Sequence, residues 1–292
     1  MTHNQGVAGS SPAGPTNIHA VETYRFIIYS NLDKFKKYLE SNKQSWNKRT
    51  PIHIESDFYR NNQFKKNLNS LKSIEIDSLG DIRRKSLLHL QCHFGQDSMS
   101  LAKMGAKVTA VDFSNIAIKE AKKIAEEINI PVHFIESDVL KLNLDKKFDI
   151  IFTSYGVIGW LPNLNKWAKT IANHLKVGGE FLLTEFHPFF QMIQDDGYNY
   201  FYDSKADCDI ESGTYTDGGE DLSTTTYWWN HSLTNIFSAL ESNKLKIIEF
   251  KEFDYSPFLL KGMIKREDGK YILEKRQKNS TPYIFNLKAL KQ

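Results

Sequence analysis

The sequence has little cysteine and no long apolar run. Cys92 and Cys208 are the only cysteines in 292 residues, which is too few for a disulfide framework and leaves no paired spacing of metal ligands. No apolar run approaches the roughly 18 residues that a membrane-crossing helix needs, and the first residues lack the charged and apolar segments of a signal peptide. We therefore expect a cytoplasmic protein with no bound metal and no membrane partner.

An excess of one charge is also missing. The chain carries 38 Lys and Arg against 35 Asp and Glu, a formal net charge of +3, so it lacks the concentrated basic charge of a nucleic-acid-binding protein. Hydrophobic residues make up 40% and charged residues 25% of the sequence, which excludes a wholly disordered or collagen-like chain. The length favours one large α/β core with additions, and it leaves the oligomeric state open.

Two segments are expected before that core. Residues 1–20 are expected to form a disordered tail, because the first 17 are crowded with Gly, Ser, Pro and Asn and offer almost nothing to bury. The stretch VAGSSPAGPT can be back-translated as a tRNA TΨC arm, so this segment is either an ordinary flexible tail or the product of a start codon placed inside an upstream tRNA gene. Residues 21–80 show helical spacing and are expected to form a helical cap, in which Trp46 and Tyr59 bracket a segment that could close over a bound ligand.

Residues 81–258 carry the pattern of the core. Short apolar runs alternate with helix-period segments, which is typical of βαβ units and a parallel sheet. Five runs predict five strands: SLLHLQC, KVTAVDF, VHFIES, FDIIFTS and EFLLTEF. One helix is expected to begin after Ser114, a plausible N-cap, and another to run through Trp167 and stop at Gly178.

The composition changes after the fifth strand. Residues 187–224 are rich in aromatic and acidic side chains and predict an insertion. That insertion could receive a cationic amine, or it is a solvated face. The runs TTTYWWN and KIIEFKEF then predict two further strands with a helix between them, and residues 259–292 remain as a C-terminal extension.

The ends of the predicted strands carry candidate ligand-binding residues. In an open α/β sheet, ligands bind beyond the carboxyl ends of the strands, where helix N-termini point. The turn at residues 91–95 follows the first strand, and Gly95 permits close approach of the backbone. Asp112 ends the second strand, where a carboxylate can accept hydrogen bonds from both hydroxyls of a ribose; alternatively it only caps the next helix, as Ser114 is placed to do. Asp138, after the third strand, can accept from an adenine amino group, although such a residue is also common loop chemistry.

Five motifs in this order resemble the class I S-adenosylmethionine-dependent methyltransferases over roughly residues 87–253. They are LLHLQCHFG for the first strand and turn, VTAVDFS for the ribose, ESDVLKL for the adenine, then FDIIFTSYGVIGWL and LKVGGEFLLTEF. In the first turn His89 replaces the usual acid, and Gln91 and His93 replace two glycines. The resemblance implies an α/β fold with a Rossmann-like, mostly parallel seven-stranded sheet and helices on both faces. It also implies an antiparallel terminal strand pair, which TTTYWWN and KIIEFKEF would supply, and makes residues 81–258 the methyltransferase domain.

The resemblance further implies S-adenosyl-L-methionine as the cofactor. The implied cofactor-binding residues follow the first four strands: Gln91, Cys92, His93 and Gly95 at the amino-acid end, Asp112 and Phe113 at the ribose and adenine, Ser137 and Asp138 at the adenine edge, and Thr153, Ser154 and Tyr155 after the fourth strand. Tyr155 or Trp160 could face the cationic sulfonium through cation–π attraction, or both could be ordinary core residues.

The methyl group is expected to emerge at the ends of the fourth and fifth strands. Tyr155 and His187 are the candidate catalytic residues there, since an unperturbed histidine pKa of about 6.5 suits a general base. His187 could equally be a loop hydrogen-bonder, and His231 is either a second candidate or a helix cap. Proximity and orientation can also drive transfer without any base.

The expected function is methyl transfer to a small-molecule acceptor, with two alternatives. An NAD(P)-dependent oxidoreductase would share the first βαβ unit and the ribose acid, but it normally needs a G-x-G-x-x-G turn, which this sequence lacks. A non-catalytic S-adenosylmethionine-binding module would fit the atypical first turn.

Overall fold

The computed structural model describes residues 18–194, 199–278 and 280–292, and the chain divides into two compact units, residues 1–38 and 39–292. Of the first unit it describes the start of helix α1 (Ile18–Glu55), which continues into the second unit. Residues 1–17 of the predicted disordered tail lie outside the described residues, whereas residues 18–20 are helical because α1 begins there. All other elements belong to the second unit.

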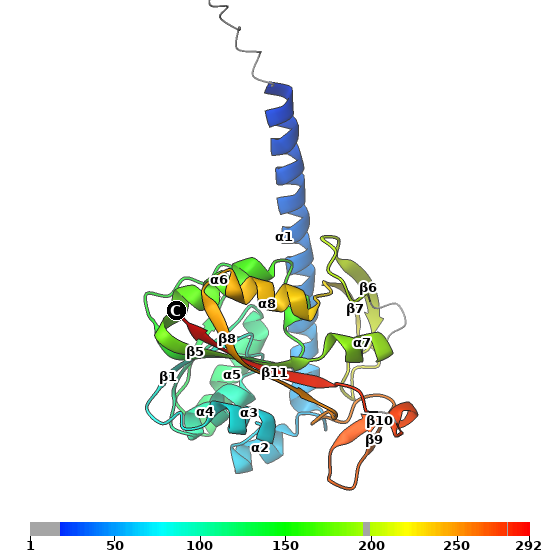
Figure 1. Cartoon of the computed structure of the whole chain (residues 1–292). Helices are drawn as coiled ribbons and strands as arrows, with labels where there is room; N and C mark the ends of the chain where they lie inside the picture. Colours follow the sequence, from blue (N-terminus) through cyan, green and yellow to red (C-terminus); the bar gives the residue numbers. More distant parts are fainter. Residues whose placement is uncertain (1–17, 195–198, 279) are drawn as a thin grey trace, which may run out of the picture. The chain divides into compact units, whose positions relative to one another are not determined.

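The second unit is built on a seven-stranded sheet (Figure 1). Its strands in spatial order are β3 (His133–Glu136), β2 (Lys107–Asp112), β1 (Ser86–Leu90), β4 (Phe148–Ser154), β5 (Leu175–Phe186), β11 (Ile284–Lys291) and β8 (Leu245–Phe253). The first five are parallel, and β11 runs antiparallel to both of its neighbours. The predicted fold class, a mostly parallel seven-stranded sheet with antiparallel strands at its end, is confirmed.

One strand of the antiparallel end differs from the prediction. The sequence predicts residues 224–230 in the terminal pair, but β7 (Ser223–Trp228) pairs with β6 (Asp207–Ser212) in a separate two-stranded ribbon. The partner of β8 is β11, from the segment predicted as a C-terminal extension. The apolar pattern of β11 is interrupted by Asn286, which is buried because its amide donates to Thr184 Oγ1 at 2.8 Å and its oxygen accepts from the Ser78 hydroxyl at 2.9 Å. Because internal partners satisfy the hydrogen bonds of Asn286, this polar residue can lie in a buried strand, although it hides the apolar pattern of β11 in the sequence.

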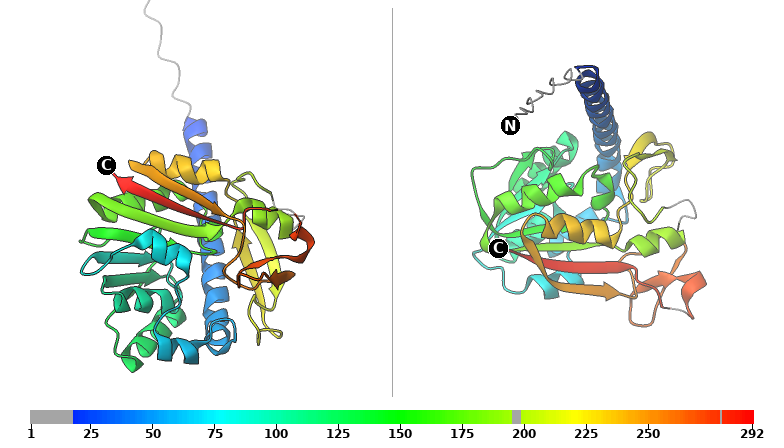
Figure 2. Two further views of the ribbon diagram at one scale, coloured as in Figure 1. Left: turned by 60° about the horizontal axis from the view of Figure 1, so that its bottom comes forward. Right: turned by 45° about the horizontal axis from the view of Figure 1, so that its top comes forward.

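Helices cover both faces of the sheet (Figure 2). α4 (Gln96–Lys103) and α5 (Asn115–Glu127) pack on one face, and α6 (Leu164–His174) and α8 (Leu233–Glu241) pack on the other. Ser114 caps α5 as predicted, since its hydroxyl accepts the Ala117 amide at 3.0 Å. α6 ends at His174 rather than at Gly178, because Leu175 already pairs with Phe148 as the first residue of β5.

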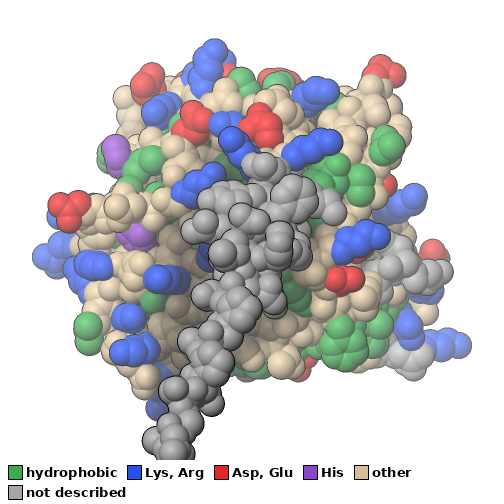
Figure 3. Space-filling model, turned by 90° about the horizontal axis from the view of Figure 1, so that it is seen from above, with side chains coloured by type: hydrophobic (Ala, Val, Ile, Leu, Met, Phe, Trp, Pro, Cys, Tyr) green, Lys and Arg blue, Asp and Glu red, His purple; other side chains and the backbone are tan. Residues whose placement is uncertain are grey.

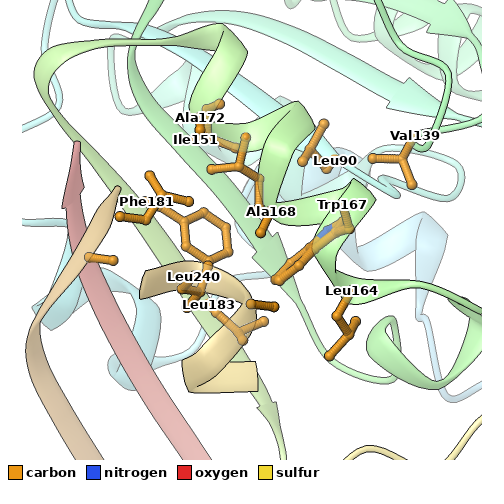
Figure 4. Packing of buried hydrophobic residues seen from close by; sticks show 14 of the residues in the cluster. Leu90, Val139, Ile151, Leu164, Trp167, Ala168, Ala172, Phe181, Leu183 and Leu240 are labelled. Carbon is orange, nitrogen blue, oxygen red and sulfur yellow. The ribbon is translucent and has the colours of Figure 1, made fainter. Parts of the chain in front are cut away.

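Two apolar clusters hold these layers together. Successive side chains of a strand point to opposite faces, so Leu87 belongs to the cluster beneath α4 and α5 and Leu88 to the cluster beneath α6 and α8. In the latter, Trp167 of α6 meets Phe181 of β5 edge-on with ring centroids 5.3 Å apart (Figure 4). Burial of such large rings contributes about 1.5 to 3 kcal/mol or more per side chain, and it fixes α6 on the sheet.

The remaining short elements are α2 (Asn61–Asn67), α3 (Ser73–Leu79), η1 (Ile158–Trp160), α7 (Pro188–Gln194), β9 (Met263–Lys265), β10 (Tyr271–Leu273) and η2 (Glu274–Arg276). The β6–β7 ribbon is joined to the second-unit part of α1, where the Asn42 side chain exchanges two 2.8 Å hydrogen bonds with the Tyr227 backbone. Trp228 of the ribbon lies against Gly159. A Cβ there would come within 1.9 Å of the indole, so only glycine leaves room for the ring.

Charges of both signs are interspersed on the face shown in Figure 3. In the described parts of the chain, no helix combines the length and apolarity needed to cross a membrane.

Candidate active site

A cavity of about 1410 Å³ opens at the carboxyl ends of the parallel strands. Its strand side is formed by residues 91–97, 111–113, 137–139 and 154–157, which follow β1, β2, β3 and β4. Its outer side is formed by residues of α1 to α3, of the β6–β7 ribbon and of the segment 258–275. Ligand pockets usually measure roughly 300 to 1,000 Å³, so this cavity is large enough for two ligands side by side.

The turn after β1 has an unusual backbone. Gln91 and His93 both have left-handed conformations, with φ of 56° and 52°, which are uncommon for residues other than glycine. They occupy the two positions where the methyltransferase pattern has glycine, so the backbone keeps the shape that glycine would allow. Gly95 has φ of 81°, and a Cβ there would lie 2.6 Å from the Phe134 ring. The turn therefore requires Gly95, while it accepts strain of about 1 to 2 kcal/mol at each bulkier residue.

Asp112 sits at the carboxyl end of β2 and faces this turn. Its Oδ2 accepts the His93 amide at 2.8 Å, and its Oδ1 accepts the Ser114 amide at 2.9 Å. Burial raises the pKa of the carboxyl to about 6, although these backbone hydrogen bonds oppose the rise. Each oxygen has a second lone pair, so a fixed, charge-bearing acceptor is offered to a ligand with two hydroxyl donors.

The next strand end continues the same wall. Phe113, Ser137 and Asp138 all line the cavity. The Ser137 amide donates to the Asp112 carbonyl at 2.9 Å, and Asp138 Oδ1 accepts the Leu140 amide at 2.9 Å. The structure thus brings the residues predicted after β1, β2 and β3 together along one edge of the sheet.

The turn after β4 is fixed by a buried acid that the sequence does not single out as a site residue. Tyr155 has φ of 45°, and its amide donates to the Thr184 carbonyl at 2.7 Å. Glu185 lies beneath it at the end of β5, where burial raises the pKa of its carboxyl. Its carboxylate accepts backbone hydrogen bonds at 2.5 to 3.1 Å from four residues: Gly156, Val157, Ile158 and Phe186. Glu185 therefore determines where Tyr155 is presented to the cavity.

Of the residues predicted after β4, two line the cavity and one does not. Ser154 and Tyr155 line it, and the Ser154 hydroxyl donates to Asp97 Oδ2 at 3.2 Å. Thr153 is fully buried, and its hydroxyl donates to the Leu90 carbonyl at 3.1 Å. The prediction that Thr153 contacts the cofactor is therefore wrong in its geometry, because the side chain of Thr153 joins β4 to β1 instead.

The structure also does not bring His187 to the cavity. Its Nε2 lies 3.0 Å from Glu252 Oε1, and its Nδ1 accepts the Phe189 amide at 3.1 Å. Burial lowers the pKa of His187, while Glu252 opposes the shift. Phe186 turns toward the cavity, and alternation along the chain directs His187 elsewhere, so its predicted place beside the methyl group is wrong. His231 also lies outside the lining of this cavity, where its Nε2 contacts the Leu161 carbonyl at 2.8 Å.

The outer side carries a cluster of aromatic rings that meets the β1 turn. Trp46 and Tyr59, which bracket the predicted closing segment, both lie against His93, with ring centroids 5.2 and 5.5 Å from it. Arg49, on the same stretch of α1, pairs with Glu211 of the ribbon. The one insertion carboxylate that lines the cavity in the described residues is therefore already paired with a cation.

Sequence reasoning missed Arg49, Glu75 and Tyr215, which also line the cavity. In the sequence these three residues stand out only as charged or aromatic residues within otherwise polar segments. Such residues are too common for that feature to identify a site. Within the described residues, no group of three or more His, Cys, Asp or Glu side chains could hold a metal ion.

Two residues of the β1 turn that line the cavity have buried polar atoms without hydrogen-bonding partners in the described structure. These atoms are Gln91 Oε1 and His93 Nε2. Burial and the nearby His53 hold the pKa of His93 well below its usual value, so the ring is neutral and Nε2 can donate or accept. Unpaired buried polar atoms are rare, and a bound ligand with polar groups at this turn would satisfy both.

Known proteins resemble this chain in sequence and in fold. A family described as a methyltransferase domain matches residues 87–179. A ubiquinone biosynthesis O-methyltransferase of Coxiella burnetii is 28% identical over 178 residues, which cover 59% of this chain and 67% of the relative. One of the same name from Rickettsia akari is 26% identical over 103 residues, covering 35% of this chain and only 41% of that protein's length. The fold matches an S-adenosylmethionine-dependent methyltransferase of Clostridium acetobutylicum with a TM-score of 0.53 and 18% identity, over 84% of this chain and 96% of that one.

Proposed function

We propose that the chain is an S-adenosylmethionine-dependent methyltransferase that transfers a methyl group from S-adenosylmethionine to a small-molecule acceptor. Residues 87–179 match a methyltransferase domain, and the fold matches that of a methyltransferase of this kind. S-adenosylmethionine supplies an electrophilic methyl group on a sulfonium. The chain's own residues would bind this donor, orient it and exclude water. The chain spans only about two fifths of the length of the Rickettsia relative. The proposed reaction therefore rests on the residues of the site and not on the activity of that relative.

The observation that carries the proposal is the position of the Asp112 carboxylate and the hydrogen bonds that hold it there. Two backbone amides hold its carboxylate at the end of β2, at the edge of a cavity large enough for donor and acceptor together. A carboxylate in this place is suited to accept both hydroxyls of a ribose. Phe113, Ser137 and Asp138 continue along the same edge and would flank the adenine.

The unpartnered atoms of the β1 turn fit the other end of the donor. Gln91 Oε1 is an acceptor suited to an ammonium group, and His93 Nε2 can donate to a carboxylate. An amino-acid group placed over this turn would satisfy both atoms. Ribose at β2 and amino acid at β1 would direct the methyl group toward β4, where Tyr155 lies, because β1 stands between β2 and β4 in the sheet.

The acceptor atom is proposed to be oxygen. The relatives from Coxiella and Rickettsia are named as O-methyltransferases, and the cavity near Tyr155 is lined by the rings of Phe186, Phe190 and Phe258. An apolar molecule with a hydroxyl group would match this lining. We also propose that the protein works in the cytoplasm.

Calorimetric titration with S-adenosylmethionine and with NADH tests the donor directly. We expect binding of S-adenosylmethionine and none of NADH; the reverse result would favour the oxidoreductase alternative. Transfer of labelled methyl groups to a small-molecule extract then separates an enzyme from a non-catalytic binding module, since the module would bind the donor and label nothing.

A further inference from the structure

Glu75 brings a buried acid from the outer side of the cavity to the turn after β4. It is the third residue of α3, and its Oε2 accepts the Lys72 amide at 2.8 Å in a capping box. The residue is only 1% exposed, yet it lines the cavity. A cap could be made by an exposed acid, so the capping role does not explain why this carboxyl is buried beside Tyr155.

The charged surroundings of Glu75 come from three elements. Tyr155 of the β4 turn, Asp97 of α4 and the Lys72 backbone of its own cap all act on its carboxyl. Burial raises the pKa of Glu75 to about 7; Asp97 raises it further, while Tyr155 and the Lys72 amide oppose the shift. The Lys72 ammonium lies over the Phe258 ring, 4.9 Å from its centroid. A pKa near neutral pH suits a general base, which must be deprotonated in order to accept a proton.

Tyr155 faces the Glu75 carboxyl, and its phenol remains protonated while Glu75 titrates. Burial, Glu75 and Asp97 together raise the pKa of Tyr155 well above its usual value, so the phenol stays neutral. Its hydroxyl is buried and has no hydrogen bond of good geometry within the described residues. Since Glu185 fixes the backbone on either side of this turn, the tyrosine hydroxyl has a constant position from which to orient an acceptor.

Apolar side chains border this pair on the side away from β1. The Tyr155 ring meets Phe258 edge-on at 4.8 Å and lies 5.8 Å from Phe186. Leu260 and Leu273 line the same part of the cavity and belong to the cluster that packs against Tyr155. A flat apolar molecule would fit between these rings with its polar group directed at Glu75 and Tyr155.

We propose that Glu75 is the general base that accepts the proton of a hydroxyl group carried by an apolar, aromatic acceptor, while Tyr155 orients that hydroxyl. This inference rests on the proposed function. The O–H bond breaks as its electron pair forms the O–CH₃ bond, and the proton passes to the Glu75 carboxylate. The S–CH₃ bond breaks and its electrons return to sulfur, which becomes a neutral thioether, so one negative and one positive charge disappear together.

The first test measures the charge beside the acceptor without any turnover. The probe is 4-nitrophenol, whose phenolate absorbs visible light, bound in the presence of S-adenosylhomocysteine. A carboxylate within about 4 to 6 Å raises the pKa of a bound phenol, so we expect the bound probe to ionise at a pH about one unit or more higher in the wild type than in Glu75→Gln. Asp77→Asn, on the exposed face of the same helix, is the matched control and should behave as the wild type.

The second test measures methyl transfer from labelled S-adenosylmethionine to 4-nitrophenol and to catechol over a range of pH. In the wild type the rate should rise with pH through about 7 and then level. Glu75→Gln should lose about a hundred-fold or more in kcat, with little change in KM and no rising limb. Glu75→Asp should regain part of the rate, which a purely structural role in the cap would not require.

The outcomes separate the two proposals. A wild type that does not bind S-adenosylmethionine overturns the proposed function. If it binds the donor but neither aromatic probe, the acceptor class is wrong and the inference is overturned alone. The inference also fails if Glu75→Gln is folded and keeps the pH profile, the rate and the ionisation of the bound probe.

Discussion

The two sides of the cavity are held in different ways. On the strand side, main-chain amides fix the acids: Asp112 accepts from the two turns that flank it, and Glu185 accepts from the turn after β4. On the outer side, the contacts between distant segments include pairs of side chains, as where Arg49 of α1 meets Glu211 of the ribbon. The sheet therefore sets the shape of the strand side, whereas the outer side can change with its side chains while the fold remains.

The largest expected effect comes from removing the acid beneath the β4 turn. Glu185→Ala leaves four backbone amides without their acceptor, and each buried unsatisfied donor costs about 1 to 3 kcal/mol. We expect a loss of about 3 kcal/mol or more in the free energy of unfolding, measured by urea denaturation. Glu180→Ala on the same strand is the control and should cost far less. Equal losses in both variants would show that Glu185 does not hold the turn.

Substitution of an acid on the outer side, Glu75, should stabilise the protein, in contrast with substitution of Glu185. Burial raises the pKa of Glu75 from its ordinary value of 4.5 to about 7 in the folded protein, so the folded state prefers the protonated carboxyl. The Glu75 carboxyl therefore does not destabilise the folded state below about pH 4.5, and its destabilising effect is complete above about pH 7. Glu75→Gln should therefore be more stable than the wild type at high pH, by up to about 3 kcal/mol. The test is urea unfolding of both proteins across this range, and an advantage that is independent of pH would contradict it.

Loss of the strand-side carboxylate should mainly affect the donor. Asp112→Ala removes a charged acceptor from the proposed ribose hydroxyls, at a cost of about 1.5 to 3 kcal/mol. Calorimetry should show affinity for S-adenosylmethionine reduced by about ten-fold to a hundred-fold. Asp145→Ala, which removes an exposed acid, should leave the affinity unchanged. Unaltered affinity in a folded Asp112→Ala protein would place the ribose elsewhere.

The smallest effect on binding and turnover is expected for substitution of a residue that belongs to neither side of the cavity. His187 contacts Glu252 and does not line the cavity, so His187→Gln should leave donor affinity and kcat nearly unchanged. The measurement is turnover with the phenolic probes at a pH above 7. A large fall in kcat at constant KM would return His187 to the reaction and weaken the assignment of Glu75.

The strand side was readable from the sequence because its signals are local. Asp112 ends its own strand, Ser114 caps the next helix two residues later, and Gly95 belongs to the turn that it shapes. The position of each residue depends on neighbours within a few residues of it in the sequence, so a short pattern predicts that position. His187 shows the limit of such patterns, because proximity to the end of β5 does not determine the direction of a side chain.

The outer side could not be read in this way. Glu75 is an ordinary capping residue in the sequence, and it becomes unusual only when α3 is buried beside the β4 turn. The same holds for Asn286, which looks unsuited to a core strand until Thr184 and Ser78 supply its partners. Burial by distant segments gives these residues their properties, and no local pattern contains that information.

The contact between Trp228 and Gly159 bears on how the proposed reaction could be directed to new acceptors. The ribbon rests on the loop after β4 through one flat indole over a residue with no side chain, and the Trp229 amide donates to the Gly159 carbonyl at 2.8 Å. A redesigned ribbon would retain its place over the cavity if it keeps this contact together with the Asn42 hydrogen bonds and the Arg49–Glu211 pair that join the ribbon to α1. Directed evolution of acceptor preference would then succeed most readily in libraries that randomise the other residues of the ribbon.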